Sequence, residues 1–415
     1  MRRRVVMTGL GLVTPLGNDV ESTWSALIEG RSGAGPITLF DATDQDVRFA
    51  CEVKDFDPSP FMDRKEVKRS DRFVQFSLAT AEQAVDAADL REALPGLPKE
   101  RFGVIIGSGI GGLMTLETQH LRMLDRGPDR VSPFFIPMFI ADMAAGLISM
   151  RYGARGPNYA TVSACASSAH ALGLAYRSIG TGEADVMIAG GTEATITPLC
   201  TAGFAAMKAL STRNDDPSTA SRPFDKYRDG FVLGEGAATL VLESLDHARG
   251  RAAPILAELV GFGQSADAYH MTAPAPEGAG AQLAIRSALA DAQVDTEDVD
   301  YVNAHGTSTP QNDATETAAL KNVFGAHAYD LVVGSTKSMT GHTLGAAGAV
   351  EGAISALVCE RGLIPPTINF EELDPECDLD YAHHGPVEKD VQVAITNSFG
   401  FGGHNVTLVV RKWTE

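Results

Sequence analysis

Short apolar runs bounded by glycine recur along the chain, and they form two series with the same order. Runs that are apolar throughout are typical of strands buried on both faces of a sheet. Helix-like stretches such as AQLAIRSALADAQ (281–293) separate them, so the pattern predicts two α/β halves of similar topology. We place the halves at 1–253 and 254–415; a chance likeness among glycine-rich strands is the alternative. The matching runs are VVMTGLG (5–11) with ELVGFGQ (258–264), GVIIGSGIGG (103–112) with YVNAHGTSTP (301–310), ATVSACASSAH (160–170) with LVVGSTKSMTGHTLGAAG (331–348), and DVMIAGGTE (185–193) plus GEGAATLVLES (234–244) with VAITNSFGFGGHNVTLVV (393–410).

The charge and the cysteines narrow the class of protein. A net charge of −19 argues against binding to nucleic acid or to an anionic membrane surface. The five cysteines include no CxxC pair, which favours a reduced compartment. The longest apolar run, FFIPMFIADMAAGLISM (134–150), holds Pro137 and Asp142 and is too short to span a bilayer. We therefore expect a cytoplasmic protein without membrane insertion.

The third matching pair carries very small side chains after a strand-like run in both halves. Alanine, serine and glycine follow Cys165, and glycine and alanine follow His342. Glycine inside a helix costs about 1 kcal/mol relative to alanine, so several glycines indicate a close approach. The simplest partner for each helix is the other one. We expect the two helices to pack together at the centre, with both N-termini near one site.

Cys165 stands where a strand gives way to a helix. A helix N-terminus carries partial positive charge and free N–H groups, which can stabilise a thiolate and bind an oxyanion. Free cysteine is also among the most buried residue types. The local sequence therefore leaves a nucleophile and a packed core residue about equally plausible.

Three further segments hold candidate groups. His305 follows an apolar run in VNAHGTSTP, at the kind of strand end where α/β folds place their sites. Lys337, in STKSMTGHTLGAAG, needs a partner such as Glu316 or Glu351 if it is buried; a surface lysine is the alternative. The loop NSFGFGGHN (397–405) could bring backbone N–H groups to a charged atom, or could be a plain turn between strands. GSGIGG (107–112) looks like a dinucleotide-binding loop, but no following helix with an acidic ribose partner is evident.

Together these segments resemble the condensing enzymes of the thiolase-like fold. The resemblance is to β-ketoacyl-acyl-carrier-protein synthases of the elongating type, with the synthase II group most similar. It covers the whole chain and implies an α/β thiolase-like fold with two pseudo-symmetric halves in α-β-α-β-α layers. The motifs that carry it are SACASSAH, VNAHGTSTP, STKSMTGHTLGAAG, NSFGFGGHN, SRPFDKYRDGFVLGEGA (221–237) and GFGQSADAYHMTAP (261–274).

The resemblance assigns roles to individual residues. Cys165 would be the nucleophile that takes the acyl chain, and His305 and His342 the histidine pair that stabilises an enolate. Lys337 matches the family's lysine, and Phe401 its gating phenylalanine, whose N–H joins that of Cys165 as an oxyanion hole. Ile110 and Phe204 match positions that line the acyl pocket, and the resemblance also implies substrate contacts by Thr307, Thr309 and Phe399.

The implied reaction is decarboxylative condensation of an acyl-acyl carrier protein with malonyl-acyl carrier protein, in fatty acid biosynthesis. A second histidine, rather than asparagine or cysteine, favours elongation over initiation or thiolase chemistry. No cofactor and no metal are expected. A polyketide ketosynthase is an alternative, and a non-catalytic chain-length-factor-like subunit is a remote one.

The resemblance also implies a homodimer with an apolar tunnel for the acyl chain near its interface. The segment SPFFIPMFIADM (132–143) would form much of the tunnel wall on the dimer side. His404 departs from the threonine common in relatives, and we expect it to be exposed.

Since acyl carrier protein is acidic, docking needs a local basic patch on this acidic chain. We predict that patch at Arg64, Lys65, Lys68, Arg69, Arg126, Arg130 and Lys208, although a solvated helix face is the usual meaning of such a run.

Overall fold

The computed structural model describes residues 2–414 and contains one ten-stranded sheet with the order β10-β9-β13-β14-β8-β1-β7-β6-β4-β5. Read inward from each edge, the two halves of this order are equivalent. In both, two parallel pairings are followed by two antiparallel ones. The strands are β1 (Val5–Val13), β4 (Phe102–Gly107), β5 (Asn158–Thr161), β6 (Val186–Glu193), β7 (Gly236–Ser244), β8 (Ala257–Ala266), β9 (Tyr301–Asn303), β10 (Val332–Gly334), β13 (Val393–Gly400) and β14 (His404–Lys412).

The two halves join through a short antiparallel contact. β1 and β8 pair only over Val5–Met7 and Ala257–Leu259. Each run of the first sequence series and its match in the second series therefore occupy equivalent places in the sheet, which confirms the predicted pseudo-symmetry. The boundary after residue 253 falls in the connection between α10 (Leu245–Gly250) and β8, and it stays a prediction.

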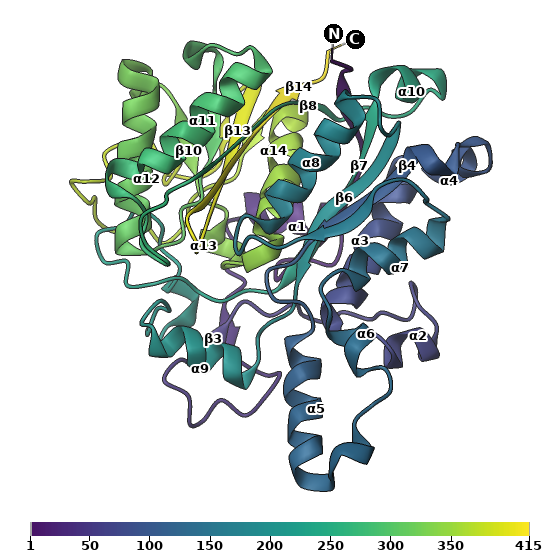
Figure 1. Cartoon of the computed structure of the whole chain (residues 1–415). Coiled ribbons are helices and arrows are strands. Elements are labelled where there is room, and N and C mark those ends of the chain that lie inside the picture. The colour runs from purple at the N-terminus through teal and green to yellow at the C-terminus, as the bar shows by residue number, and fades with distance from the viewer. Residues whose placement is uncertain (1, 415) are drawn as a thin grey trace.

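Helices lie between the two halves of the sheet and outside them (Figure 1). The central pair, α8 (Ser167–Gly180) and α14 (Ala347–Arg361), contacts strands of both halves. α3 (Arg72–Ala87) and α7 (Met143–Tyr152) cover the outer face of the first half, and α11 (Ala279–Ala292) and α12 (Pro310–Phe324) cover that of the second. This is the α-β-α-β-α layering predicted from the resemblance.

The remaining elements are short or lie at the ends of the layers. No helix among residues 2–414 is long and apolar enough to cross a membrane. The helices are α1 (Val20–Ile28), α2 (Arg64–Lys68), α4 (Leu90–Ala93), α5 (Leu113–Arg126), α6 (Phe135–Phe139), α9 (Pro198–Ala206) and α13 (Lys337–Thr340), and the short strands are β2 (Gly35–Pro36), β3 (Phe49–Ala50), β11 (Leu363–Ile364) and β12 (Val387–Glu388).

The small residues of the central helices serve two close approaches. A Cβ built on Gly348 of α14 would lie 2.7 Å from the Ala169 backbone nitrogen of α8, so these helices do pack against each other as predicted. Gly173 of α8 differs from the expectation, because a Cβ there would lie 2.3 Å from the ring of Phe262 on β8. One glycine thus accommodates the partner helix and the other accommodates the sheet of the second half.

Candidate active site

Loops from both halves converge on one cavity of about 630 Å³. Cys165 lies between β5 and α8, two residues before that helix begins, and His342 lies in the connection between α13 and α14. His305 follows β9, and Phe401 lies in the turn between β13 and β14. All four line the cavity. The pseudo-symmetry therefore brings together groups that are far apart in the sequence.

The sulfur and the two imidazoles form a compact cluster. His342 Nε2 lies 3.0 Å from Cys165 Sγ. The rings of His305 and His342 are nearly perpendicular, with centroids 5.3 Å apart. Both histidines are buried. A trigonal carbonyl carbon of a substrate next to Sγ would therefore have an imidazole on each of two different sides.

The protonation state of Cys165 differs from the expectation that the helix N-terminus favours a thiolate. Burial raises the pKa of this thiol to about 12, although the charge of Lys337 lowers it. Backbone N–H groups of Phe401 and Cys165 also favour the thiolate by hydrogen bonding, but to a smaller extent. The charge of Glu193 raises the pKa of Cys165 as well. The resting sulfur is thus a neutral thiol, because desolvation and the Glu193 charge outweigh the Lys337 charge and the two N–H groups.

Both histidines are neutral imidazoles. Burial lowers the pKa of His305 and of His342 well below the ordinary value, and the charge of Lys337 lowers both further. A neutral ring has one N–H donor and no charge of its own. The pair can therefore donate hydrogen bonds to a developing negative charge.

Lys337 is buried, which excludes the surface alternative, and its ammonium group contacts the carboxylate of Glu351. Burial raises the pKa of Glu351, and the adjacent ammonium group opposes this. Glu316, the other suggested partner, instead accepts the backbone N–H groups of His305 and Gly306, each at 2.8 Å. One carboxylate thus partners the lysine, and the other fixes the loop that carries His305.

Two features of the site were missed in the sequence. Phe231 packs edge-on against His342, with centroids 5.4 Å apart, and Phe204 packs edge-on against Phe231. Phe231 lies in one of the family-like motifs, but a phenylalanine carries no chemical signal of its own. Ala164 adopts a left-handed conformation, with φ of 50°, immediately before Cys165. Such strain in a non-glycine residue is invisible in sequence and is common at functional sites.

The predicted substrate-binding residues lie around the same cavity. Ile110, Phe204, Thr307, Thr309 and Phe399 all line it. Phe399 stands edge-on to His305 at 5.6 Å, and the hydroxyl oxygens of Thr307 and Thr309 are 3.0 Å apart. The assigned roles of these residues stay predictions.

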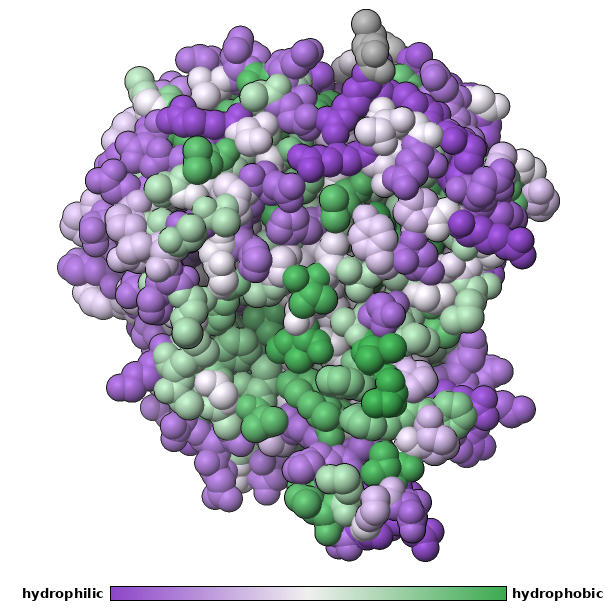
Figure 2. All heavy atoms as spheres, viewed as in Figure 1, coloured by the Kyte–Doolittle hydropathy of each residue, from purple (hydrophilic) through white to green (hydrophobic). Residues whose placement is uncertain are grey.

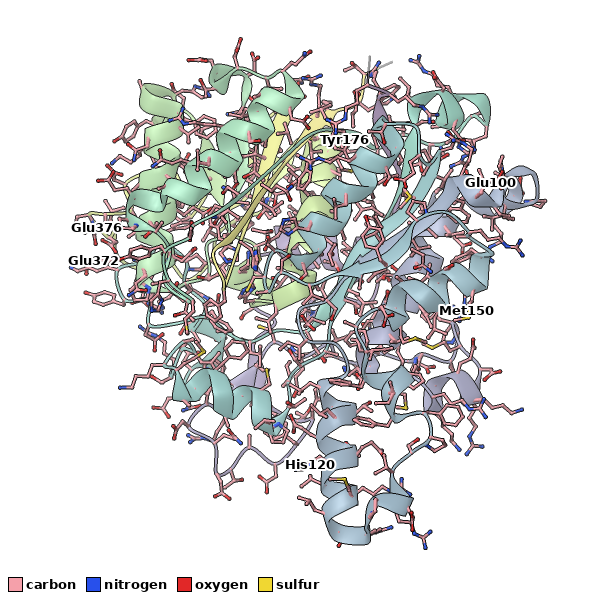
Figure 3. All side chains as sticks on the ribbon, in the orientation of Figure 1. Glu100, His120, Met150, Tyr176, Glu372 and Glu376 are labelled. Atoms are coloured by element: carbon pink, nitrogen blue, oxygen red, sulfur yellow. The ribbon has the colours of Figure 1, made fainter. Side chains whose placement is uncertain are left out.

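The predicted docking residues are divided between two places. Lys208 lines the cavity. Arg64, Lys65, Lys68 and Arg69 are exposed on and just after α2, away from the cavity lining. Arg126 ends α5, the helix that carries His120 in Figure 3, and Arg130 follows it; both are exposed. The docking role of all seven residues stays a prediction.

His404 is half-buried, so the expectation that it is exposed was wrong. Its ring stands edge-on to that of His170 on α8, with centroids 6.5 Å apart. His170 Nδ1 in turn lies 2.7 Å from Ser163 Oγ. The His404 ring therefore lies against the central helix and is not fully exposed to solvent.

No cluster of three or more histidine, cysteine, aspartate or glutamate side chains within residues 2–414 could hold a metal ion. The cavity and its surroundings offer a thiol, two neutral imidazoles, a buried ion pair and backbone N–H donors. Such groups suit acyl transfer through a thioester.

Comparison with known proteins identifies similar chains along the whole length. The family models described as "Beta-ketoacyl synthase, N-terminal domain" and "Beta-ketoacyl synthase, C-terminal domain" match residues 2–248 and 256–371. The "3-oxoacyl-[acyl-carrier-protein] synthase 2" of Synechocystis sp. is 55% identical, with 99% of each chain covered. The protein of the same name from Coxiella burnetii is 52% identical, with 99% of each chain covered. A solved type II PKS ketosynthase, in complex with its acyl-carrier protein, is 35% identical with a TM-score of 0.93 and full coverage of both chains.

Proposed function

The chain belongs to the β-ketoacyl synthase family, and on that premise we propose that its site elongates acyl chains carried by acyl carrier protein. The reaction is a condensation of acyl-acyl carrier protein with malonyl-acyl carrier protein to give the 3-oxoacyl product. It is the reaction described by the name of the relatives at 55% and 52% identity, 3-oxoacyl-[acyl-carrier-protein] synthase 2, and we assign it to fatty acid biosynthesis. The observation that carries the assignment is the contact of His342 Nε2 with Cys165 Sγ beside a second neutral histidine.

The first step transfers the acyl chain to the enzyme. Cys165 Sγ forms a bond to the acyl carbon, and the bond from that carbon to the carrier's sulfur breaks. The thiol proton ends on the departing carrier thiolate, and His342 Nε2 is the side-chain group at hydrogen-bond distance from Sγ. The N–H groups of Cys165 and Phe401 are directed at the sulfur, where they can also stabilise the oxyanion on the attacked carbonyl.

The second step forms the carbon–carbon bond. Malonyl-acyl carrier protein loses carbon dioxide, and the electron pair left behind is shared with the thioester oxygen as an enolate. The neutral imidazoles of His305 and His342 donate hydrogen bonds to that oxygen without adding charge to a buried site. The enolate carbon attacks the acyl carbon, Sγ leaves as a thiolate, and uptake of one proton restores the thiol.

Lys337 acts electrostatically in this scheme. Its ammonium group lowers the pKa of the Cys165 thiol and of both histidines. It therefore favours the thiolate when Sγ leaves and keeps both imidazoles neutral as the enolate forms. The ion pair with Glu351 makes a buried ammonium group tolerable.

Intact-mass analysis of the enzyme with acyl-acyl carrier protein and malonyl-acyl carrier protein tests the proposal. We expect an acyl adduct and elongated product, both lost in Cys165→Ala. Cys200→Ala is the matched control, because both cysteines are 8% exposed and burial raises the pKa of both thiols to about 12. Condensation that survives Cys165→Ala, or an adduct on another cysteine, would contradict the assignment.

The two alternative functions are not favoured. The relatives at 55% and 52% identity are named 3-oxoacyl-[acyl-carrier-protein] synthase 2, whereas the polyketide ketosynthase is 35% identical. A non-catalytic subunit would not need Cys165 in contact with a histidine.

We also propose that the protein acts in the cytoplasm. Its buried cysteines form no disulfide within residues 2–414, which agrees with a reducing compartment.

We further propose a homodimer formed through the β5 edge of the sheet. At the opposite edge, β10 is buried and Val333 N–H donates to the Asp380 carbonyl at 2.8 Å. β5 is the equivalent edge strand, yet Tyr159 is 40% exposed and Val162, just beyond it, is 64% exposed. Hydrophobic side chains also gather over the lower part of the face in Figure 2. Exposed large apolar residues on α5, α6 and the neighbouring loops are Ile110, Leu121, Met123, Leu124, Phe134 and Ile136.

Acyl carrier protein is the partner that delivers both substrates, and we propose that the basic residues on and just after α2 dock it. The side chains of Lys65 and Arg69 are exposed on a protein of net charge −19, so a local positive patch can orient an acidic carrier. Lys65→Glu with Arg69→Glu should raise KM for the carrier about tenfold at low salt and leave kcat nearly unchanged. Arg286→Glu, which reverses an exposed charge on α11, is the control. An unchanged KM in the double variant would exclude this docking surface.

A further inference from the structure

The glycine-rich segment 107–112, which starts at the last residue of β4, is filled by a carboxylate of the protein itself. Glu193, the last residue of β6, is completely buried. Its Oε2 accepts the Gly109 N–H at 2.7 Å, and its Oε1 accepts the Ile110 N–H at 3.2 Å and the Ser108 hydroxyl at 3.0 Å. Donors that bind an anion in a phosphate-binding loop are here satisfied within the protein.

The same carboxylate also reaches the second half of the molecule. Gly345 N–H donates to Glu193 Oε2 at 3.0 Å. Gly345 lies three residues after His342, in the turn that leads into α14. One side chain thus connects a loop of the first half to the segment that continues from a histidine of the active site.

Glu193 is suited to this position by its charge as well as by its shape. Burial raises the pKa of its carboxyl group, and the hydrogen bonds from Gly109, Ser108, Gly345 and Ile110 lower it. All four partners donate, and an ionised carboxylate only accepts. A glutamine of the same size would turn its NH₂ group toward at least one of these donors and leave buried polar groups unpaired.

Ile110 gives this arrangement a functional consequence. Its backbone is bound to Glu193, and its side chain, 36% exposed, lines the cavity around Cys165. We propose that Glu193 is a positioning residue that sets acyl-chain selectivity, by holding the Ile110 wall of the cavity in register with the His342 segment. The proposal rests on the proposed condensing activity, and it adds a residue that does not touch the reacting atoms.

The test compares purified wild type, Glu193→Gln and Glu243→Gln in condensation assays with malonyl-acyl carrier protein. Glu243 is the matched control, since it is also completely buried but lies at the opposite end of the neighbouring strand and binds Arg251. The readout is the ratio of kcat/KM for a preferred acyl chain to that for a longer or shorter one. We expect this ratio to fall at least about fivefold in Glu193→Gln and to stay unchanged in Glu243→Gln.

Intact-mass analysis of Cys165 acylation separates the failure of this proposal from the failure of the proposed function. Wild type that is never acylated would contradict the condensing activity itself. An active Glu193→Gln enzyme with wild-type selectivity would overturn the positioning role alone, as would an equal change in Glu243→Gln. If Glu193→Gln does not fold, Ser108→Ala decides, because it removes one donor and keeps the carboxylate. It should change the ratio in the same direction, and an unchanged ratio would again overturn the proposal.

Discussion

At the scale of single residues, the site depends on neutral groups kept apart from water. Burial keeps the Cys165 sulfur protonated and both imidazoles uncharged. Neutral donors next to a neutral thiol cost less to bury than ions, and they become useful only when charge develops in the reaction. The one buried cation in the cluster, Lys337, has its own carboxylate partner.

Alkylation of Cys165 by a neutral reagent should depend on pH as its raised pKa predicts. With a pKa of about 12, the thiolate fraction is small and grows about tenfold per pH unit. The rate should therefore keep rising from about pH 7 to about pH 9.5, whereas an ordinary cysteine levels off near its pKa of about 8.5. Peptide mass mapping over this range measures it, with Cys165→Ala as the blank. A plateau below about pH 8 would show that the site holds a thiolate at rest.

Lys337→Ala should destabilise the fold more than loss of the whole ion pair does. It leaves Glu351 buried without its cation, which costs about 3–5 kcal/mol, whereas Lys337→Met with Glu351→Met removes both charges. Burial raises the pKa of Glu351, so a free Glu351 takes up a proton more readily as pH falls. The penalty of Lys337→Ala should therefore shrink toward acid pH. Urea unfolding at several pH values measures it, and equal losses in both variants would contradict this account.

At the scale of elements, the two central helices determine where the catalytic groups meet. Thirteen consecutive residues of α14, from Ala347 to Cys359, are buried. A helix that is buried on every side belongs to the interior of a layered fold. Its contact with α8 brings the segments before the two helices, with Cys165 and His342, to the same end of the layer.

Gly348→Ala should destabilise the protein by about 1–3 kcal/mol, because its Cβ would meet the Ala169 backbone nitrogen at 2.7 Å. Gly146→Ala is the control, since Gly146 lies inside α7 and a Cβ there meets nothing within 4 Å. That substitution should stabilise the fold by about 0.5–1 kcal/mol. Thermal or urea unfolding of both variants makes the comparison. A neutral Gly348→Ala would show that the helices can separate at no cost.

At the scale of the whole molecule, the sheet has one covered edge and one bare edge. The segment at Asp380 caps β10, while β5 lies open next to apolar side chains. A bare edge with exposed apolar residues tends to pair with another chain, and a second copy offers the same edge in return.

Val162→Lys should therefore shift the protein from dimer to monomer in size-exclusion chromatography with light scattering. Lysine near the edge introduces like charges on both copies of an interface that is otherwise apolar. Leu283→Lys is the control, because Leu283 is 60% exposed, close to the 64% of Val162, but lies on α11 over the outer face of the other half. A wild type that elutes as a monomer, or a Val162→Lys variant that remains a dimer, would argue against this interface.

The sequence by itself determined the repeated topology and the family. Both follow from local patterns: apolar runs mark strands, small residues mark a close helix contact, and motifs around Cys165, His305 and His342 mark the chemistry. Which partner each group takes depended on tertiary structure. Only the fold showed that Lys337 pairs with Glu351 while Glu316 binds the His305 loop, and that Gly173 makes room for Phe262. The fold also decided that the Cys165 thiol is protonated at rest. Burial and long-range contacts determine these properties, and neither is encoded in the residues adjacent along the chain.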